Sequence, residues 1–435
     1  MMAGPALQFA LVVIPLAGAA LGLAVWSNPR RLKQWALLVA IASGLLLLGM
    51  AGRLTAPAEG MLPLALLPMA AFLTLLGQPT HPDNRQAWLM TLALLGLGLG
   101  VRISHDHLGS IFLLLLLGLV AALLYRHRAM SGSVPWWGIG TCGLGVIGLL
   151  LSLIAPPSVS AGALLMACAI LLPLPPLHGS YVAAFRGLPG NLPAFLALLL
   201  PSLGFHRLLD LMPSLPEPLV EALVLPALAG MLYGSMKALT QSRVRLLLAY
   251  AGLSFFSILW WYVAATRTAP PQAGVYLCSV GLATGGLLLA WHAIQARYGE
   301  VDRRAVTGLV YRMPRFAVLV SLLALAAMGL PPFGLFSGFL SLLLAPSLPR
   351  SGAWLIVFGA WLTASWYILD MVQGLLFGRQ RSDLRYTDLR RSEFASLVLC
   401  LLLLIALGLT PARFFQPGTS TPQLRTAMES LSWNR

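Results

Sequence analysis

The stretch LLPLPPLHG, residues Leu171–Gly179, interrupts one long apolar run, and GLPPFGLFSG, residues Gly329–Gly338, interrupts another. Proline has no amide proton and clashes with the preceding helical turn, so a helix is expected to break at each of these places. The residues expected to cause the breaks are Pro173, Pro175, Pro176, Pro331 and Pro332.

The composition around these breaks is that of a membrane protein. Of 435 residues, 58% are hydrophobic and only 9% are charged, whereas a soluble domain has about 25% charged residues. The formal net charge of +15 would suggest a nucleic-acid partner in a soluble protein. In a membrane protein it indicates basic residues retained on one side of the bilayer, so no nucleic-acid partner is expected.

The apolar runs between charge clusters and Pro/Gly breaks predict about 14 transmembrane helices in an all-α polytopic protein. They are expected near residues 6–26, 35–51, 61–77, 86–101, 109–125, 136–155, 160–178, 193–211, 219–241, 245–265, 273–293, 314–345, 352–377 and 394–411. The breaks near 171–179 and 329–338 fall in the seventh and twelfth spans. Paired broken helices five spans apart indicate two inverted five-helix repeats, as in transporter cores.

The predicted organisation has four parts. Residues 1–85 hold three N-terminal helices, 86–241 the first inverted repeat, 242–378 the second, and 379–435 the last helix and a short tail. If the N-terminus lies outside, most of the 28 basic residues fall in loops on the inner side. The positive-inside rule therefore predicts both termini on the non-cytoplasmic side.

No pattern for a catalytic centre, metal or cofactor is found. The four cysteines are far apart and lie inside apolar runs, which favours buried packing over metal binding or redox chemistry. No metal cluster, nucleotide-binding glycine loop or nucleophile–base pair occurs in a suitable context. We therefore expect no cofactor, and a non-catalytic subunit rather than an enzyme by itself.

Four strings resemble one known family. QSRVRLLLAYAGLS at Gln241–Ser254 resembles its Q-x-D-x-K-R-L-L-A-Y-S-S-x-S-H element, and PPLHGSY at Pro175–Tyr181 resembles P-x-H-x-W-L-P at the seventh helix. GLVYRMP at Gly308–Pro314 and the later GLPPFGLFSGF resemble G-L-x-x-x-M-P and G-L-P-P-x-A-G-F-x-G-K/E, and WYILDMVQGLLFG at Trp366–Gly378 resembles the thirteenth-helix ending. The chain thus resembles, over about 100–411, the antiporter-like proton-translocating subunits of complex I, membrane hydrogenases and Mrp sodium/proton antiporters.

The resemblance implies proton pumping through buried lysines, histidines and a glutamate halfway across the membrane. The family's lysines of the seventh and eighth helices fall at Leu171 and Ser202, and the charged residue of the twelfth falls at Phe339. The other pump positions fall within Leu115–Gly118, for the glutamate, and near Ser279 and Thr284. Buried ionisable groups are costly and normally kept for function. The chain is therefore predicted to be a divergent member that lacks most of the buried pump residues.

Four polar residues remain as candidates for a proton path: His178, Lys237, His292 and Asp370. His178 follows the first break, where it would relay protons or cap carbonyls freed by the break. Lys237 would reach a cavity or extend to the interface, and Asp370 would pair with a basic residue of a neighbouring helix or subunit or lie near the interface. His292 is expected at a solvated helix end.

The predicted function is that of an antiporter-like membrane subunit in a bacterial inner-membrane complex related to NADH-quinone oxidoreductase, degenerate in pumping and acting as a scaffold or partner-docking subunit. Its expected partners are other membrane subunits and the lipid bilayer. The alternative is a working proton or cation pathway coupled to a soluble partner, as in a bicarbonate/CO2-uptake complex for inorganic carbon transport. Basic loops at 297–315 and 379–391 would then dock an acidic or zinc-containing protein on the cytoplasmic side, or would simply satisfy the positive-inside rule.

Overall fold

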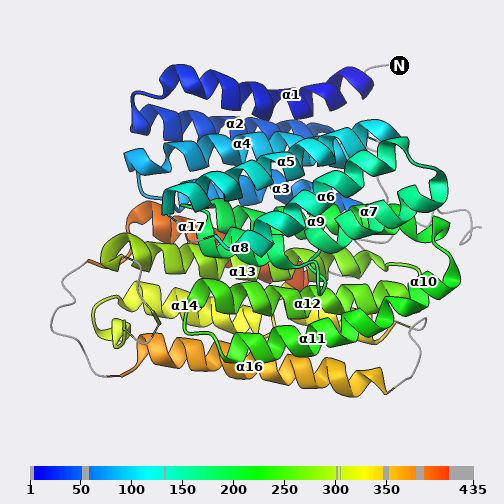
Figure 1. Ribbon diagram of the computed structural model, residues 1–435. Coiled ribbons are helices and arrows are strands. Elements are labelled where there is room, and N and C mark those ends of the chain that lie inside the picture. The colour runs from blue at the N-terminus through cyan, green and yellow to red at the C-terminus, as the bar shows by residue number, and fades with distance from the viewer. Residues whose placement is uncertain are drawn as a thin grey trace, which may run out of the picture.

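A chain surrounded by hydrocarbon has to pair its backbone polar groups internally, and a helix does so within one segment. In the computed structural model, all regular structure in the part of the chain that is described is helical. The described residues are 4–50, 58–104, 106–131, 134–299, 302–303, 305–345, 352–378 and 387–410. The helices run roughly parallel or antiparallel to one another in a single bundle (Figure 1).

The helices before the first break are α1 (Gly4–Gly22), α2 (Pro29–Met50), α3 (Ala58–Leu76), α4 (Arg85–Ile103), α5 (Asp106–Ser131), α6 (Trp136–Ile154) and α7 (Pro157–Leu171). Those between the breaks are α8 (Gly179–Gly187), α9 (Leu192–Leu211), α10 (Glu217–Ala222), α11 (Val224–Leu239), α12 (Val244–Thr266), α13 (Pro271–Tyr298) and α14 (Pro314–Ala327). The last are α15 (Gly334–Leu343), α16 (Ala353–Leu376) and α17 (Arg391–Leu409). Short 3-10 turns are η1 (Leu23–Val25), η2 (Pro82–Asn84), η3 (Met212–Ser214) and η4 (Leu309–Tyr311).

The described helices match the predicted spans. Two predicted spans contain two helices each, namely α10–α11 and α14–α15, and each other span corresponds to one helix. The seventh span, predicted to end at 178, holds α7 and the break, and α8 follows directly after it. Within the described residues, 11 helical segments are long and apolar enough to cross a membrane, and shorter apolar helices supply the rest. The all-α polytopic class is therefore confirmed. Several boundaries were wrong. The second span starts at Pro29 rather than 35, so Lys33 lies inside the helix, and the fifth and eleventh spans end at Ser131 and Tyr298 rather than at 125 and 293.

The first break is confirmed between α7 and α8. Pro173, Pro175 and Pro176 have no amide proton to donate, so carbonyls at the end of α7 need other partners. The indole N–H of Trp260 on α12 donates to the carbonyl of Leu172 at 3.0 Å. A side chain from a distant helix thereby satisfies the backbone where the helix stops.

The second break is confirmed between α14 and α15, and it closes in a different way. The amide of Gly329 donates to the carbonyl of Ala326, and that of Leu330 donates to the carbonyl of Leu325. This pair of bonds is the Schellman motif, which requires a left-handed residue at its centre. Gly329 supplies it with φ of 72° and lies directly against the Trp361 ring.

A third division, between α10 and α11, was not predicted. Pro226 lies in the first turn of α11 and cannot donate to the carbonyl of Ala222, so the helical hydrogen-bond pattern is interrupted at Leu223. Other single prolines, at Pro15 in α1 and Pro201 in α9, leave their helices continuous. Proline clusters followed by glycine, rather than isolated prolines, therefore mark the complete breaks in this chain.

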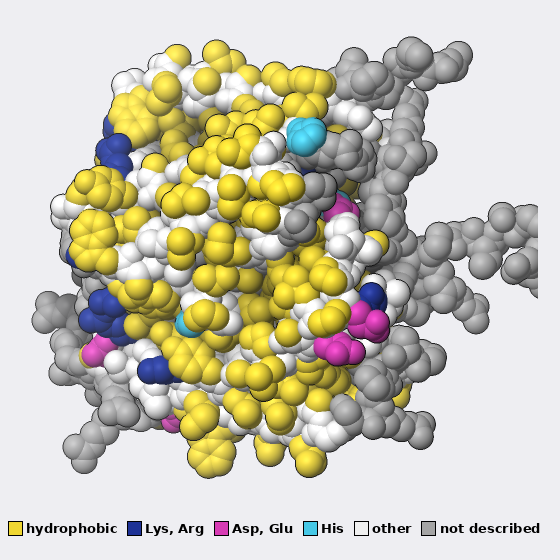
Figure 2. Space-filling view, turned by 45° about the vertical axis from the view of Figure 1, so that its right-hand side comes forward, with side chains coloured by type: hydrophobic (Ala, Val, Ile, Leu, Met, Phe, Trp, Pro, Cys, Tyr) yellow, Lys and Arg dark blue, Asp and Glu magenta, His cyan; other side chains and the backbone are white. Residues whose placement is uncertain are grey.

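The core of the bundle is formed by α12 and α13. The apolar stretch of α13 is buried along its whole length, and the helix contacts α3, α9, α15 and α17. Hydrophobic side chains cover the middle of the visible face, and Lys and Arg gather toward one end of it (Figure 2). We call the end where α2 and α14 start and α13 finishes the basic end of the bundle.

Replacing Trp260 with Phe is expected to lower the free energy of unfolding by about 1–3 kcal/mol, because the buried carbonyl of Leu172 loses its partner. The measurement is unfolding of the purified chain in mixed micelles with increasing SDS. Trp354→Phe is the matched control, since no hydrogen bond of the Trp354 indole is found among the described residues. Equal losses in the two variants would contradict the assignment.

Candidate functional site

His178 lies directly before α8, where the first break ends, and it is buried among aromatic rings. Its ring is 5.7 Å from Trp137 of α6, 5.4 Å from Tyr233 of α11 and 6.3 Å from Tyr250 of α12, between ring centroids. The buried Nδ1 atom has no hydrogen-bond partner among the described residues, and the side chain makes no capping bond. The carbonyl of Leu172 at the break is bonded by Trp260 instead, so whether His178 relays protons or caps another carbonyl stays a prediction.

Lys237 is placed next to the same aromatic group. It lies in the last turn of α11, is exposed, and its Nζ atom is 6.0 Å from the centroid of Tyr233. The ring of Tyr233 also contacts His178. The structure thus brings two of the four candidate residues together through one tyrosine, at a place where Tyr233 and Trp137 are themselves partly exposed.

The other two candidates lie apart from this group. His292 is half-buried on α13, and its Nε2 atom has no hydrogen-bond partner in the described part of the chain. Asp370 on α16 accepts a bond from Arg303 at 2.6 Å, which ties the segment after α13 to α16. The expected alternatives for Asp370 were a basic partner on a neighbouring helix or subunit, or a place near the interface. Its partner Arg303 lies in the connection between α13 and α14 instead.

The positions of the family's charged residues are filled by packing. Leu171 is fully buried at the end of α7, and Ser202 on α9 bonds only to a carbonyl of its own helix, at 2.8 Å. Phe339 on α15 stacks on Trp361 with ring centroids 3.6 Å apart. Leu171 and Phe339 have no ionisable group, and the Ser202 hydroxyl donates its proton to the carbonyl of Leu199.

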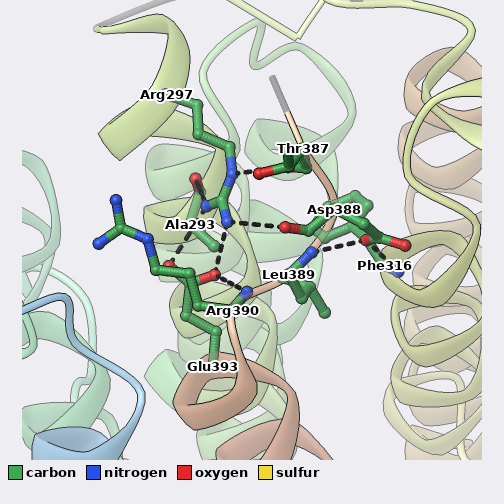
Figure 3. A network of polar contacts seen from close by, with 8 residues as sticks. All are labelled: Ala293, Arg297, Phe316, Thr387, Asp388, Leu389, Arg390 and Glu393. Atoms are coloured by element: carbon green, nitrogen blue, oxygen red, sulfur yellow. Dashed lines mark hydrogen bonds and ion pairs between the residues drawn. The ribbon is translucent and has the colours of Figure 1, made fainter.

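The strongest charged contact is a buried ion pair that the sequence did not indicate. Arg297 at the end of α13 binds both carboxylate oxygens of Glu393 on α17, at 2.7 and 3.3 Å, and both side chains are buried. Its remaining N–H groups donate to the carbonyls of Ala293, Thr387 and Asp388. All five guanidinium donors are therefore used (Figure 3).

Asp388 extends the same network to α14. Its carboxylate accepts the backbone amides of Arg315 and Phe316, at 2.8 and 3.2 Å. These amides are in the first turn of α14, where N–H groups lack partners within the helix and the helix dipole favours an anion. The short segment before α17 is thus fixed to both α13 and α14, as Figure 3 shows.

A second polar cluster lies at the basic end among α2, α3, α4 and the start of α9. Lys33 donates to the carbonyls of Leu76 and Gln78, and Gln78 and Asn191 are completely buried. Sequence reasoning missed this cluster because Lys33 was placed in a loop and amides carry no charge pattern. The rarity of lysine in the chain was the available signal.

Nothing in the described residues forms a metal centre. No group of three or more His, Cys, Asp or Glu with suitable geometry is found there, and the four cysteines are buried with free thiols, as expected from their apolar surroundings.

Residues 108–364 match the family described as NADH:quinone oxidoreductase/Mrp antiporter, transmembrane. The chain is 28% identical over 367 residues to NADH-quinone oxidoreductase subunit N 1 of Symbiobacterium thermophilum, covering 80% of this chain and 68% of that protein. It is 32% identical over 263 residues to NADH-quinone oxidoreductase subunit 13 of Thermus thermophilus, covering 57% of this chain and 54% of that protein. The matches thus span about half to two thirds of these relatives.

The fold is also that of a solved structure. A chain in respiratory complex I from Thermus thermophilus aligns with a TM-score of 0.77 at 24% identity, covering 94% of this chain and 96% of that one. At this identity the likeness concerns the arrangement of helices.

Arg297→Met is expected to lower the free energy of unfolding by about 3–5 kcal/mol, because it leaves the buried Glu393 carboxylate without its counter-charge. The double variant Arg297→Met/Glu393→Leu should regain much of this loss, since no unpaired charge then remains. Unfolding in SDS-containing mixed micelles measures both.

The control for this pair is Asp370→Asn, which breaks the more exposed ion pair with Arg303 and should cost less than about 1 kcal/mol. If the double variant loses as much free energy of unfolding as the two single variants added together, Arg297 and Glu393 act independently. That result would contradict the network of Figure 3.

Proposed function

We propose that this chain, which belongs to the NADH:quinone oxidoreductase/Mrp antiporter family of transmembrane proteins, is an antiporter-like subunit of a multi-subunit membrane complex related to respiratory complex I. Its matched relatives bear the names of NADH-quinone oxidoreductase subunits. Its partners are then other membrane subunits, and its surroundings the bacterial inner membrane. In this assembly the chain is degenerate in pumping and serves as a scaffold or docking subunit.

The observation that carries the degenerate role is the packing at the former pump positions. The stack of Phe339 on Trp361 at 3.6 Å leaves no room between the rings for the water that a proton relay needs. Leu171 is apolar, and the hydroxyl of Ser202 does not change charge at physiological pH. The chain keeps both broken helices and has uncharged side chains at the pump positions. In this way it preserves the shape that neighbouring subunits contact.

The alternative is a working proton or cation pathway that uses other groups. The observation in its favour is that His178 and Lys237 both lie next to the ring of Tyr233. Coupling to a soluble partner, as in bicarbonate uptake, receives less support from the basic loops. Arg297 is buried in an internal ion pair and Arg303 is bound to Asp370, so neither is free to bind an acidic protein.

The orientation and organisation follow from the same assignment. We place both termini on the non-cytoplasmic side, so that the basic end faces the cytoplasm. We retain the division into residues 1–85, 86–241, 242–378 and 379–435. The breaks lie in the seventh and twelfth spans, so the two broken helices cross the bundle in opposite directions, which supports inverted repeats.

Purification of the native protein in mild detergent should recover several other membrane subunits in stoichiometric amounts. Mass spectrometry of the intact complex identifies them. Recovery with a single soluble zinc protein would instead favour the carbon-uptake alternative. Recovery of the chain alone would contradict the subunit assignment.

The pumping role is tested in liposomes. The purified chain is expected to show no potential-driven proton uptake above that of empty vesicles, measured with a pH-sensitive dye inside the vesicles. The double variant His178→Ala/Lys237→Ala should likewise leave the activity of the host complex unchanged. Substantial proton flux that these two substitutions abolish would establish the alternative pathway.

A further inference from the structure

Five buried polar residues form a connected group near the basic end of the bundle. They are Lys33 on α2, Thr74 on α3, Gln78 in the connection after α3, Thr91 on α4 and Asn191 directly before α9. Each is at most 7% exposed. We call Thr74, Gln78, Thr91 and Asn191 the amide cluster. It is separate from His178 and from both helix breaks.

The hydrogen bonds fix the orientation of both amides. The hydroxyls of Thr74 and Thr91 donate to carbonyls of their own helices, so they accept the bonds from Asn191 Nδ2, at 3.3 and 2.9 Å. The indole of Trp88 is only a donor, so the atom of Gln78 that it contacts at 2.6 Å is Oε1. Asn191 therefore presents Oδ1 as an acceptor, and Gln78 presents Nε2 as a donor.

Both of these atoms are buried and have no partner among the described residues. The two residues are neighbours in the fold. Gly190 directly precedes Asn191 in the chain, and the place where a Cβ atom of Gly190 would stand is 2.1 Å from Gln78 Nε2. A buried amide without a hydrogen bond is costly. One water molecule accepts from a donor and donates to an acceptor at the same time, which is what this pair of atoms requires.

A small cavity borders the cluster at Thr74. Thr74 also lines a cavity of about 10 Å³ between α3, α9, α13 and α17, which is on the order of the space that one water molecule needs. Gly281 and Gly285 of α13 form another part of its wall. The polar group therefore reaches from the basic end toward the buried central helix.

Lys33 is the charged member of the group. Two of its three N–H groups donate to the carbonyls of Leu76 and Gln78, and one is left for water. Glu393 of α17 attracts the ammonium, and Arg390 before α17 repels it. From the other packed helices, α1 and residues 61–76 of α3 contribute no ionisable residue, and α4 contributes Arg85 in its first turn at this end.

We propose that a water molecule bridges Gln78 Nε2 and Asn191 Oδ1, and that this hydrated cluster makes Lys33 a proton-exchanging residue inside the N-terminal helices. In the exchange the Lys33 ammonium gives a proton to water and takes one back, so no other reactant is required and the charge balances. The inference does not depend on which complex the chain joins, or on whether protons cross the whole membrane.

The chain is suited to a direct test, because its sequence contains only two lysines, Lys33 and Lys237. The full chain is labelled with 15N at lysine Nζ, reconstituted in lipid vesicles, and studied by magic-angle-spinning NMR. Lys33→Arg and Lys237→Arg assign the two signals. Magnetisation transferred from water protons to 15Nζ reports contact with water at each site, with the exposed Lys237 as internal control.

In the wild type, Lys33 is expected to receive magnetisation from water despite its burial. Asn191→Leu removes the acceptor Oδ1 and should slow the transfer to Lys33 severalfold without changing that to Lys237. Ser43→Ala is the matched control, because this buried hydroxyl of α2 lies outside the amide cluster and donates to the carbonyl of Val39 in its own helix. The transfer to Lys33 should then stay near its wild-type rate.

Two results would overturn the proposal. A Lys33 signal that receives no magnetisation from water in the wild type would show a dry site, and this result needs no variant that has to fold. Transfer to Lys33 that is unchanged in Asn191→Leu would show that Lys33 meets water at the protein surface instead of through the amide pair.

Discussion

The structure depends on one constraint: a backbone polar group at a helix end inside the bilayer needs a partner from the protein. The partners come from elsewhere in the chain. Trp260 of α12 bonds to the carbonyl at the end of α7, Lys33 of α2 bonds to carbonyls at the end of α3, and Asp388 caps the first turn of α14. Each bond satisfies a helix end and at the same time fixes one helix to another.

The same constraint explains where the charges remain. Buried positions in the middle of the described bundle are filled by apolar or aromatic contacts, such as Phe339 on Trp361, and an unpaired charge inside a membrane protein is costly. At the basic end, by contrast, Arg297 and Glu393 are kept as a fully bonded buried pair. This buried ion pair lies where α13 and α17 are joined.

Much of this could be read from the sequence. The two proline–glycine stretches located the breaks, since a run of prolines removes several helical donors at once and no neighbouring turn can replace them. Length and hydropathy gave the number of spans. The isolated Pro226 was harder, because Pro15 and Pro201 look similar in sequence yet leave their helices continuous; whether one proline divides a helix depends on the packing around it.

The sequence by itself determined the class, the order of helices and the positions of the breaks, because these depend on local hydrophobicity and on the placement of proline. Only the tertiary structure decided which polar groups meet. Arg297 and Glu393 are far apart in the chain, as are Thr91 and Asn191, and nothing in local composition distinguishes a buried amide or arginine from an exposed one. Their partners are set by how α4 packs on α9 and α13 on α17, and burial of the resulting pairs gives them their strength.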